Sequence, residues 1–363
     1  MKMFKKFAAI VLILILAVQM ALPSFAEDTQ TEEQVSNVFQ IYLSGIDAQG
    51  EMTDESRTDA NIVATVNMDT KQVLLVHVPR DYYLDFPDGT KDKLSINGLK
   101  GIRSVLWCVG NLFKYDIPYY ARINFNGFVE VIDAMGGVDL ESDYEFTTSL
   151  GGFHIDKGMN HLNGEQALGF VHERYAFNAG DRQRGRDQMI LLEACINQLS
   201  SGSALQNLPA FLEATNNFME TNIPFNVILQ MLQAQGTEGQ WNVVSTSVDG
   251  TDSKVGDSYV MEPNMESVEA ARTLMQRVMD GEILDQDTDA PNLIEGEGAI
   301  DFGTKEMIMK VQTALNNAGY DCGTPDGVVG PQTQKAIWAY QEANGLTPSG
   351  AINMELARSL GLV

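Results

Sequence analysis

The 363-residue chain contains few cysteines, and the three present, Cys108, Cys195 and Cys322, lie far apart. Their spacings of 87 and 127 residues match neither a zinc module nor a small disulfide scaffold. We therefore expect buried thiols. A disulfide between Cys108 and Cys195 stays open as an alternative, because an oxidising compartment would permit it.

Histidines and basic residues are also scarce. The four histidines form no H-E-x-x-H or comparable metal pattern, which disfavours a zinc hydrolase; they are His77, His154, His161 and His172. Only 24 lysines and arginines stand against 49 acidic residues, which gives a formal net charge of -25. Nucleic-acid binding requires an extended basic face, so we expect no nucleic-acid partner.

The apolar run near the N-terminus, from Phe7 to Leu22, is short for a membrane span. Lysines precede it, and the small-residue pattern Ser24-Phe25-Ala26 follows it, as in an export signal. We expect residues 1–26 to be a signal peptide that is cleaved after Ala26, in preference to an uncleaved membrane anchor. The mature protein would then be extracytoplasmic.

Strand and helix patterns are mixed along the following 245 residues. Alternating or β-branched runs predict strands at 38–43, 61–68, 72–78, 119–125 and 241–248. Apolar residues at helical spacing predict helices at 96–112, 127–135, 164–174, 187–199 and 265–279. Because no strict βαβ repeat occurs, we expect one α/β domain over residues 37–281, with a mixed sheet covered by helices on both faces. An acidic, Gly- and Pro-containing linker over 282–300 separates it from a small unit at 301–363.

Four of the eleven arginines fall within thirteen residues, at Arg174, Arg182, Arg184 and Arg186. The secondary-structure pattern predicts that this run is a loop leading into a helix. Guanidinium groups bind phosphate or carboxylate oxygens in pairs, so the run indicates an anionic ligand such as pyrophosphate. Surface ion pairs at an exposed helix start are the alternative.

Further charged residues follow or precede predicted strands: Asp47, Arg57, Asp59, Arg80 and Asp81. Loops at strand ends assemble the sites of open α/β sheets, so we expect these side chains to converge. Carboxylates supply hard oxygen ligands for Mg²⁺, and arginines bind phosphate oxygens. Each motif alone is also explained by a helix cap, an ion pair or a turn, so the prediction depends on their combination.

In this order the motifs resemble the LytR-CpsA-Psr family: L-S-G-I-D at 43–47, R-T-D at 57–59, V-P-R-D at 78–81, then A-M-G-G-V-D at 134–139, G-E-Q-A-L at 164–168 and E-R-Y-A-F at 173–177 before D-R-Q-R-G-R-D-Q at 181–188. The family moves anionic glycopolymers, such as wall teichoic acid or capsule, from an undecaprenyl-pyrophosphate carrier to peptidoglycan. The resemblance implies Mg²⁺ as cofactor, these partners, and a membrane surface reached through the lipid donor.

The resemblance also implies roles for individual residues. Asp47 and Asp59 match the family's Mg²⁺-binding aspartates. The arginines that match pyrophosphate contacts are Arg57, Arg80, Arg174 and Arg184, with Gln188 beside them and Arg182 and Arg186 as supporting candidates. The resemblance does not identify a general base, for which Asp81 or a metal-bound aspartate is the candidate. Simple pyrophosphate hydrolysis and a non-catalytic wall or lipid-phosphate binding protein remain alternatives.

Three residues depart from the family pattern. His172 stands where many members have arginine, Asp187 replaces an arginine before the glutamine, and His77 replaces a common serine. The loss of two arginines is expected to affect affinity or rate more than the chemistry.

Residues 301–363 resemble the peptidoglycan-binding domain type 1, a three-helix module. The most specific motif is the D-G-x-x-G-x-x-T turn at 326–333, whose glycines adopt backbone conformations that other residues resist. This module implies association with the cell wall through peptidoglycan.

Overall fold

The computed structural model of the protein describes residues 36–48, 56–177, 179–200, 218–224, 226–227, 230–231, 241–256, 258–290, 304–346, 350, 352 and 354–362. The predicted signal peptide, residues 1–26, and residues 291–300 of the predicted linker lie outside these ranges. The chain forms two compact units, Met1–Asp139 with Gly185–Leu293 and Leu140–Arg184 with Ile294–Val363.

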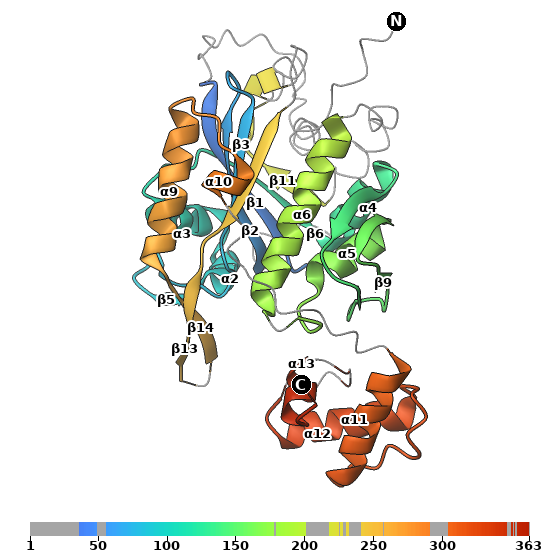
Figure 1. Cartoon of the computed structure of the whole chain (residues 1–363). Coiled ribbons are helices and arrows are strands. Elements are labelled where there is room, and N and C mark those ends of the chain that lie inside the picture. The colour runs from blue at the N-terminus through green and yellow to red at the C-terminus, as the bar shows by residue number, and fades with distance from the viewer. Residues whose placement is uncertain are drawn as a thin grey trace, which may run out of the picture. The chain divides into compact units, whose positions relative to one another are not determined.

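Within the described residues, the first unit contains a six-stranded mixed sheet with strand order β11-β6-β1-β2-β3-β12 (Figure 1). β1 pairs with β6 and β3 pairs with β12 in parallel, and the other neighbours are antiparallel. The predicted mixed sheet is confirmed. The strands are β1 (Val38–Ile46), β2 (Thr58–Asn67), β3 (Gln72–His77), β6 (Tyr119–Asn124), β11 (Met219–Thr221) and β12 (Asn242–Ser247).

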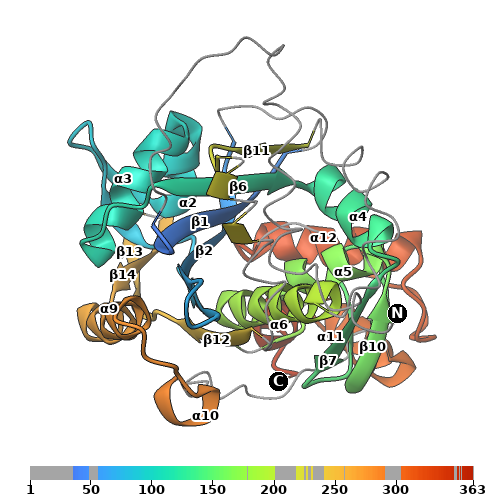
Figure 2. The same ribbon diagram turned by 90° about the horizontal axis from the view of Figure 1, so that it is seen from above.

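Helices cover both faces of this sheet (Figures 1 and 2). On one face, α3 (Ile102–Phe113) and α9 (Met265–Met279) bury a core that includes Leu74 and Val76 of β3. Side chains alternate along a strand, so His77 points to the opposite face, where Gly185 of α6 (Asp181–Ser200) packs on it. α4 (Phe125–Ala134) follows β6 and is capped by Asn124, whose side chain accepts from Gly127 N.

The predicted helix over 96–112 is interrupted. It consists of α2 (Leu94–Asn97), a 3₁₀ turn (Gly98–Lys100) and α3. A Cβ at position 98 would lie 2.3 Å from Ser56 O, so only glycine allows this approach to the chain before β2. Gly101 has φ +87°, a conformation that L-residues resist and that ends the 3₁₀ turn.

Two antiparallel hairpins of the first unit escape the sequence patterns. The first pairs β4 (Tyr83–Asp85) with β5 (Lys91–Lys93), and the second pairs β13 (Gly250–Val255) with β14 (Ser258–Pro263). β13 and β14 have mostly exposed or half-buried residues and little apolar alternation, which is why periodicity does not predict them.

The first unit extends beyond the predicted boundary at residue 281. Leu284 and Ala290 are each 2% exposed and belong to the core formed with α9. Between them lies α10 (Gln286–Asp289), capped by the Asp285 side chain. The beginning of the acidic segment is therefore structured. Cys108 and Cys195 are buried free thiols, as expected, and the alternative disulfide between them does not form.

The second unit begins with short strands and one helix. Their bounds are β7 (Val138–Ser142, which starts in the first unit), β8 (Phe146–Thr147), β9 (His154–Ile155), β10 (Gly158–Leu162) and α5 (Gly164–His172). Phe146, Phe170 and Phe177 pack their rings together at centroid distances of 4.9 to 6.0 Å. A capping box between Asn163 and Gln166 fixes the start of α5.

The expectation that the arginine run forms a loop is wrong from Asp181 onward. α6 begins at Asp181, so Arg182, Arg184 and Arg186 are helical. Arginine and glutamine are good helix formers, and an aspartate in the first turn stabilises the positive end of the helix dipole. Gly180, with φ +55°, provides the turn before the helix.

The C-terminal part has the expected three helices within its described residues: α11 (Lys305–Asn317), α12 (Pro331–Ala343) and α13 (Met354–Ser359). Val311, Leu315 and Ile337 are completely buried in its core. The buried Gln312 side chain accepts from the amides of Asp326 and Gly327 and donates to Asp326 and Thr333. The side-chain amide of Gln312 therefore holds the D-G-x-x-G-x-x-T turn in place.

Candidate active site

The first two predicted strand-end residues flank neighbouring strands of the first unit: Asp47 directly follows β1, and Arg57 directly precedes β2. Asp47 N donates to Arg57 O at 2.9 Å, which places the two residues side by side where β1 ends and β2 begins. Both side chains are exposed, whereas Thr58 between Arg57 and Asp59 is 2% exposed and points into the core. The pleat of the strand therefore turns Arg57 and Asp59 away from the core.

Asp59 binds the arginine that follows β3. Arg80 Nη1 lies 2.9 Å from Asp59 Oδ1, and Arg80 Nε lies 3.7 Å from Asp81 Oδ2. The three side chains are only 10–18% exposed. Their charges are incompletely solvated, so they interact more strongly than they would on an open surface. The structure thus brings together Asp59, Arg80 and Asp81, as the sequence predicts.

Lys93 joins this cluster, and the sequence reasoning missed it. Its ammonium group lies 3.0 Å from Asp81 Oδ1, so Asp81 interacts with Lys93 through one oxygen and with Arg80 through the other. Lys93 ends β5, a three-residue strand without an apolar pattern. The local sequence gives no signal for this lysine. Lys93 reaches Asp81 because β5 pairs with β4, which begins shortly after Asp81.

Arg122 is a second cation that the sequence reasoning missed. It lies on β6, is 3% exposed and forms an ion pair with Glu220 of β11, with Nε 2.7 Å from Oε2. Tyr120 donates to the other oxygen of Glu220 at 2.7 Å. The Arg122 side chain lines a small cavity between the sheet and α3, together with Tyr42, Ser44, Ile46, Ser56, Thr58, Gly98, Ile102 and Val105.

A hydrogen-bond chain borders this cavity. Tyr42 OH donates to Asn61 Oδ1 at 2.5 Å and contacts Thr58 Oγ1 at 2.9 Å, and Thr58 contacts Ser44 Oγ at 2.6 Å. Burial raises the pKa of Tyr42 to about 12, so the phenol remains protonated in the physiological range. The chain holds the ends of β1 and β2 in register, next to Asp47 and Asp59.

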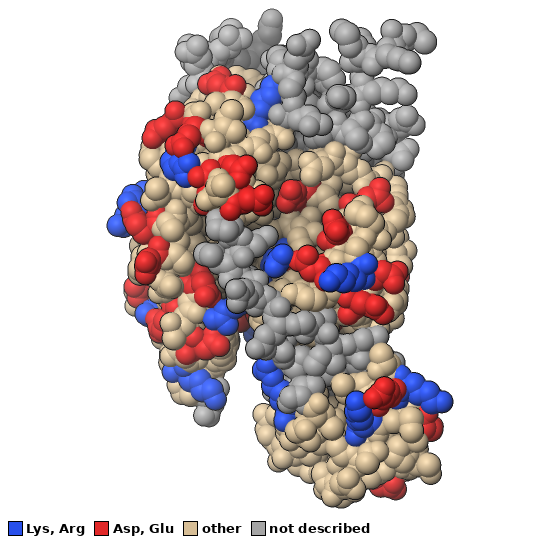
Figure 3. Space-filling view, viewed as in Figure 1, with Lys and Arg blue, Asp and Glu red and all other residues tan. Residues whose placement is uncertain are grey.

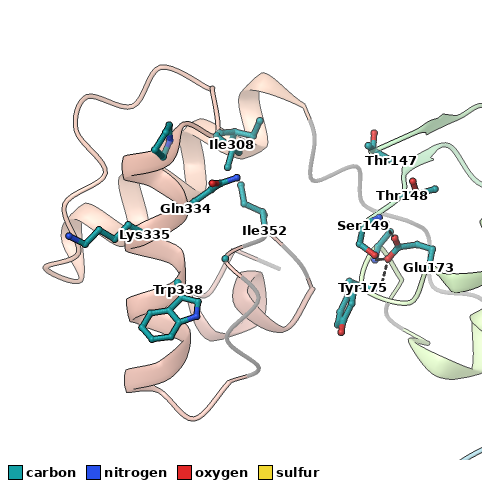
Figure 4. A pocket seen from close by; sticks show the side chains of 14 residues that line it. Thr147, Thr148, Ser149, Glu173, Tyr175, Ile308, Gln334, Lys335, Trp338 and Ile352 are labelled. Atoms are coloured by element: carbon teal, nitrogen blue, oxygen red, sulfur yellow. Dashed lines mark hydrogen bonds between the residues drawn. The ribbon is translucent and has the colours of Figure 1, made fainter. Parts of the chain in front are cut away.

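In the second unit, Glu173 organises the loop that carries Arg174. One carboxylate oxygen accepts from the amides of Arg174, Tyr175 and Ala176 at 2.6 to 3.0 Å. The other accepts from Ser149 N, and Figure 4 shows Ser149 and Tyr175 beside Glu173. Glu173 is only 1% exposed, so these charge-assisted bonds are protected from water. The Arg174 guanidinium stacks on the Tyr175 ring and donates to its hydroxyl at 2.6 Å.

The remaining candidates lie on α6. Arg184 is 4% exposed and pairs with Asp181 at 2.5 Å within the second unit. Gly185, Arg186, Asp187 and Gln188 follow in the first unit, where Gly185 packs on His77, three residues before Arg80. The start of α6 in that unit is thereby held near the end of β3. The placement of Arg174, Arg182 and Arg184 relative to the aspartates stays a prediction.

The residues that depart from the family pattern occupy different surroundings. His77 is 5% exposed, lies beneath Gly185 and contacts Ser247 Oγ through Nδ1 at 3.1 Å. Asp187 is 3% exposed on α6, and His172 is half-buried in the last turn of α5.

The described residues contain neither a cluster of metal-ligating side chains nor a helix that could span a membrane. Over the described ranges, no three or more His, Cys, Asp or Glu side chains form a group able to hold a metal ion. Nor does any helix in the described part of the chain have the length and hydrophobicity needed to span a membrane.

Asp59, Arg80, Asp81 and Lys93 thus form a series of alternating negative and positive side chains. Guanidinium and ammonium groups in such a series can bind phosphate oxygens. Residues 17–277 match the LytR_cpsA_psr family, and residues 304–360 match the putative peptidoglycan binding domain. The chain belongs to the LytR_cpsA_psr family and carries a C-terminal peptidoglycan-binding domain.

Two curated relatives are named polyisoprenyl-teichoic acid–peptidoglycan teichoic acid transferase TagU. The protein from Oceanobacillus iheyensis is 29% identical over 217 residues, or 58% of this chain and 66% of the relative. The protein from Bacillus anthracis is 33% identical over 193 residues, or 53% of this chain and 62% of the relative. The match therefore spans less than two thirds of each relative. The crystal structure of Bacillus subtilis TagV superposes with TM-score 0.57 and 28% identity, covering 67% of this chain and 97% of that one.

Proposed function

We propose that this protein transfers an anionic glycopolymer of the teichoic acid or capsule type from an undecaprenyl-pyrophosphate carrier to peptidoglycan. The observation that carries the proposal is the contact series from Asp59 through Arg80 and Asp81 to Lys93. Family membership and the names of the TagU relatives support it. The muramic acid 6-hydroxyl would lose its proton to a base, for which Asp81 is a candidate, and its oxygen would form a bond to the sugar-linked phosphorus. The bridging P–O bond of the pyrophosphate breaks, and undecaprenyl phosphate leaves.

Mg²⁺ fits the residues available as cofactor. Asp47 is exposed, and Asp59 uses Oδ1 for Arg80, so carboxylate oxygens of both residues would hold the ion. Mg²⁺ commonly takes one or two protein carboxylates and completes its shell with water and substrate phosphate, so a larger protein ligand group is not required. When bound, the ion would neutralise charge on the pyrophosphate.

The chain's own residues would position the donor and stabilise its charge. Arg80 is fixed by Asp59 before any substrate binds, so little reorganisation is needed when it meets a phosphate. Asp81 interacts with both Arg80 and Lys93, which gives it a positioning role for two cations in addition to its candidacy as general base. Arg57, Arg174, Arg184 and Gln188 would contact the pyrophosphate, with Arg182 and Arg186 in support.

The proposed location is the cell wall outside the membrane. The export signal would be removed after Ala26, and the C-terminal domain would keep the enzyme near its acceptor. In that domain, Trp338 on α12 is 45% exposed and lies near Gln334 and Lys335 (Figure 4).

The test uses purified protein, Mg²⁺ and a polyprenyl-pyrophosphate-linked saccharide, with undecaprenyl phosphate release measured with and without soluble peptidoglycan fragments. Acceptor-dependent release with saccharide joined to the fragment is the expected result. Release that ignores the acceptor would indicate pyrophosphate hydrolysis. Absence of release in both conditions would contradict an enzymatic function and favour a binding protein.

A further inference from the structure

The β13–β14 hairpin projects beyond the central sheet of the first unit (Figure 1). Its strand β14 contacts the main chain at Asp81 and Tyr82, next to the candidate active-site residue Arg80. Met261 N donates to Asp81 O at 2.8 Å, and Tyr82 forms a parallel bridge with Met261. Because the attachment point is the backbone of Asp81, the hairpin is positioned by the same segment that carries the cluster.

Two tyrosines near this hairpin are each paired with a lysine. Lys93 Nζ lies 5.5 Å from the ring centroid of Tyr259 on β14, and Lys91 Nζ lies 4.5 Å from that of Tyr83 on β4. Tyr83 and Lys93 are also paired across β4 and β5. Tyr259 is 37% exposed, and its hydroxyl donates to Asp252 at 3.0 Å, which limits rotation of the ring.

Lys93 connects the tyrosines to the candidate active site. The ammonium group that faces the Tyr259 ring also lies 3.0 Å from Asp81 Oδ1, and Asp81 leads to Arg80 and Asp59. All of these residues belong to the first unit. The Tyr259 ring is therefore connected to the candidate active site through Lys93.

The charges on this surface indicate which substrate it fits. The four strands of the two hairpins carry three lysines against four carboxylates, and Figure 3 shows both positive and negative side chains on the β13–β14 hairpin. They are Lys91, Lys93 and Lys254, and Asp85, Asp92, Asp252 and Glu262. A surface without net positive charge is a poor match for a polyanionic donor polymer. Rigid tyrosine rings with polar neighbours suit the apolar faces and hydroxyls of an uncharged sugar ring.

We infer that Tyr259 and Tyr83 form a binding surface for the glycan strand of the peptidoglycan acceptor. The surface holds a sugar ring against Tyr259 so that the neighbouring acceptor hydroxyl reaches the phosphate bound near Arg80. The identity of the acceptor rests on the proposed function, whereas the binding of a glycan to the two tyrosines is a separate property of the hairpins.

The kinetic test measures the transfer reaction as a function of peptidoglycan fragment concentration. Tyr259→Ala is expected to raise the KM for the fragment about tenfold, the loss of one aromatic contact, while the KM for the lipid donor is unchanged. Tyr259→Phe keeps the ring and should change the acceptor KM less than about twofold. Trp107→Ala, which removes an aromatic side chain that is 45% exposed on α3, is the matched control and should behave as wild type.

An unchanged acceptor KM in Tyr259→Ala overturns the inference. A raised donor KM with an unchanged acceptor KM overturns it as well and assigns the surface to the donor polymer.

A second measurement does not require turnover. A peptidoglycan fragment with a diazirine group is photocrosslinked to the full chain, and labelled peptides are identified by mass spectrometry. Labelling within 250–263 that is lost in Tyr259→Ala is expected, even if transfer is absent, in which case only the proposed function fails. Labelling confined to the C-terminal domain overturns the acceptor surface whether or not transfer occurs.

Discussion

Gly185 of α6 packs directly on the imidazole of His77: a Cβ added at position 185 would lie 2.3 Å from Cε1 and 2.7 Å from both ring nitrogens. His77 is 5% exposed and contacts Ser247, so the ring has little room to move aside. His77 precedes Arg80 by three residues, and Gly185 precedes Arg186 and Gln188. This one contact therefore fixes the spacing between two segments that carry candidate site residues.

The contact predicts that the effect of Gly185→Ala on the free energy of unfolding changes sign when His77 is replaced by serine. Gly185→Ala should destabilise the wild-type protein by about 1–3 kcal/mol, because the extra methyl group overpacks the site. In the His77→Ser background the ring is absent, and Gly185→Ala should instead stabilise the helix by up to about 1 kcal/mol, the helix propensity of alanine over glycine. Denaturant unfolding of the four proteins measures the coupling. Equal effects of Gly185→Ala in both backgrounds would show that the two residues do not interact.

Replacement of Arg80 tests the centre of the site. Arg80→Ala should reduce transfer by at least about 10²-fold, because a pre-oriented hydrogen-bond donor to the phosphate is lost. Arg80→Lys keeps the charge without the planar fork and should give an intermediate rate. Circular dichroism and thermal unfolding check that the variants fold.

Arg272→Ala is the control for Arg80, since Arg272 is a partly exposed arginine of α9 that binds Glu269 three residues earlier. It should leave the rate unchanged. If Arg80→Ala retains full activity while folded, the assignment of the site to this strand end is wrong.

Sequence patterns predict the parts of this protein in which local chemistry determines position. The buried strands β2 and β3 have continuous apolar or β-branched runs, and their ends carry Asp59, Arg80 and Asp81, which the structure brings together. The α9 helix is predicted over its observed span because amphipathic spacing continues through all 15 residues.

Residues placed by tertiary contacts were not predictable in this way. Lys93 reaches Asp81 only because a three-residue strand folds back on β4, and Arg122 is defined by Glu220, 98 residues away. The start of α6 was missed because its first turn is highly polar and lacks an apolar stripe. Its glycine contact with His77 depends on packing between distant segments, which periodicity does not report.

Glu173 provides a test of the Arg174 loop. In Glu173→Gln the amide nitrogen would face backbone N–H donors and could not accept from them, so at least one of the four bonds is lost. We expect a loss of about 1–3 kcal/mol in local stability, seen as faster hydrogen exchange in residues 174–176, together with reduced transfer. Glu141→Gln, an exposed change on β7, should leave exchange in this loop unaltered. Unchanged protection in Glu173→Gln would contradict an organising role for the carboxylate.

Glu193 on α6 predicts a pH dependence of stability. Burial raises the pKa of the Glu193 carboxyl above its ordinary value of 4.5, because desolvation disfavours the charged form. The folded state therefore holds a proton that the unfolded state has released, and stability falls as pH rises from about 4.5 through the raised pKa. Above that pH the folded protein pays the full cost of a desolvated carboxylate.

Glu193→Gln removes this ionisation and should stabilise the protein at pH 7 while changing little below pH 4.5. Thermal unfolding of both proteins between pH 4 and pH 8 measures the difference, which should grow with pH and then level off. Glu130→Gln, on the exposed side of α4, is the matched control and should show no such growth. A constant difference across the whole range would mean that the Glu193 carboxyl titrates equally in the folded and unfolded states.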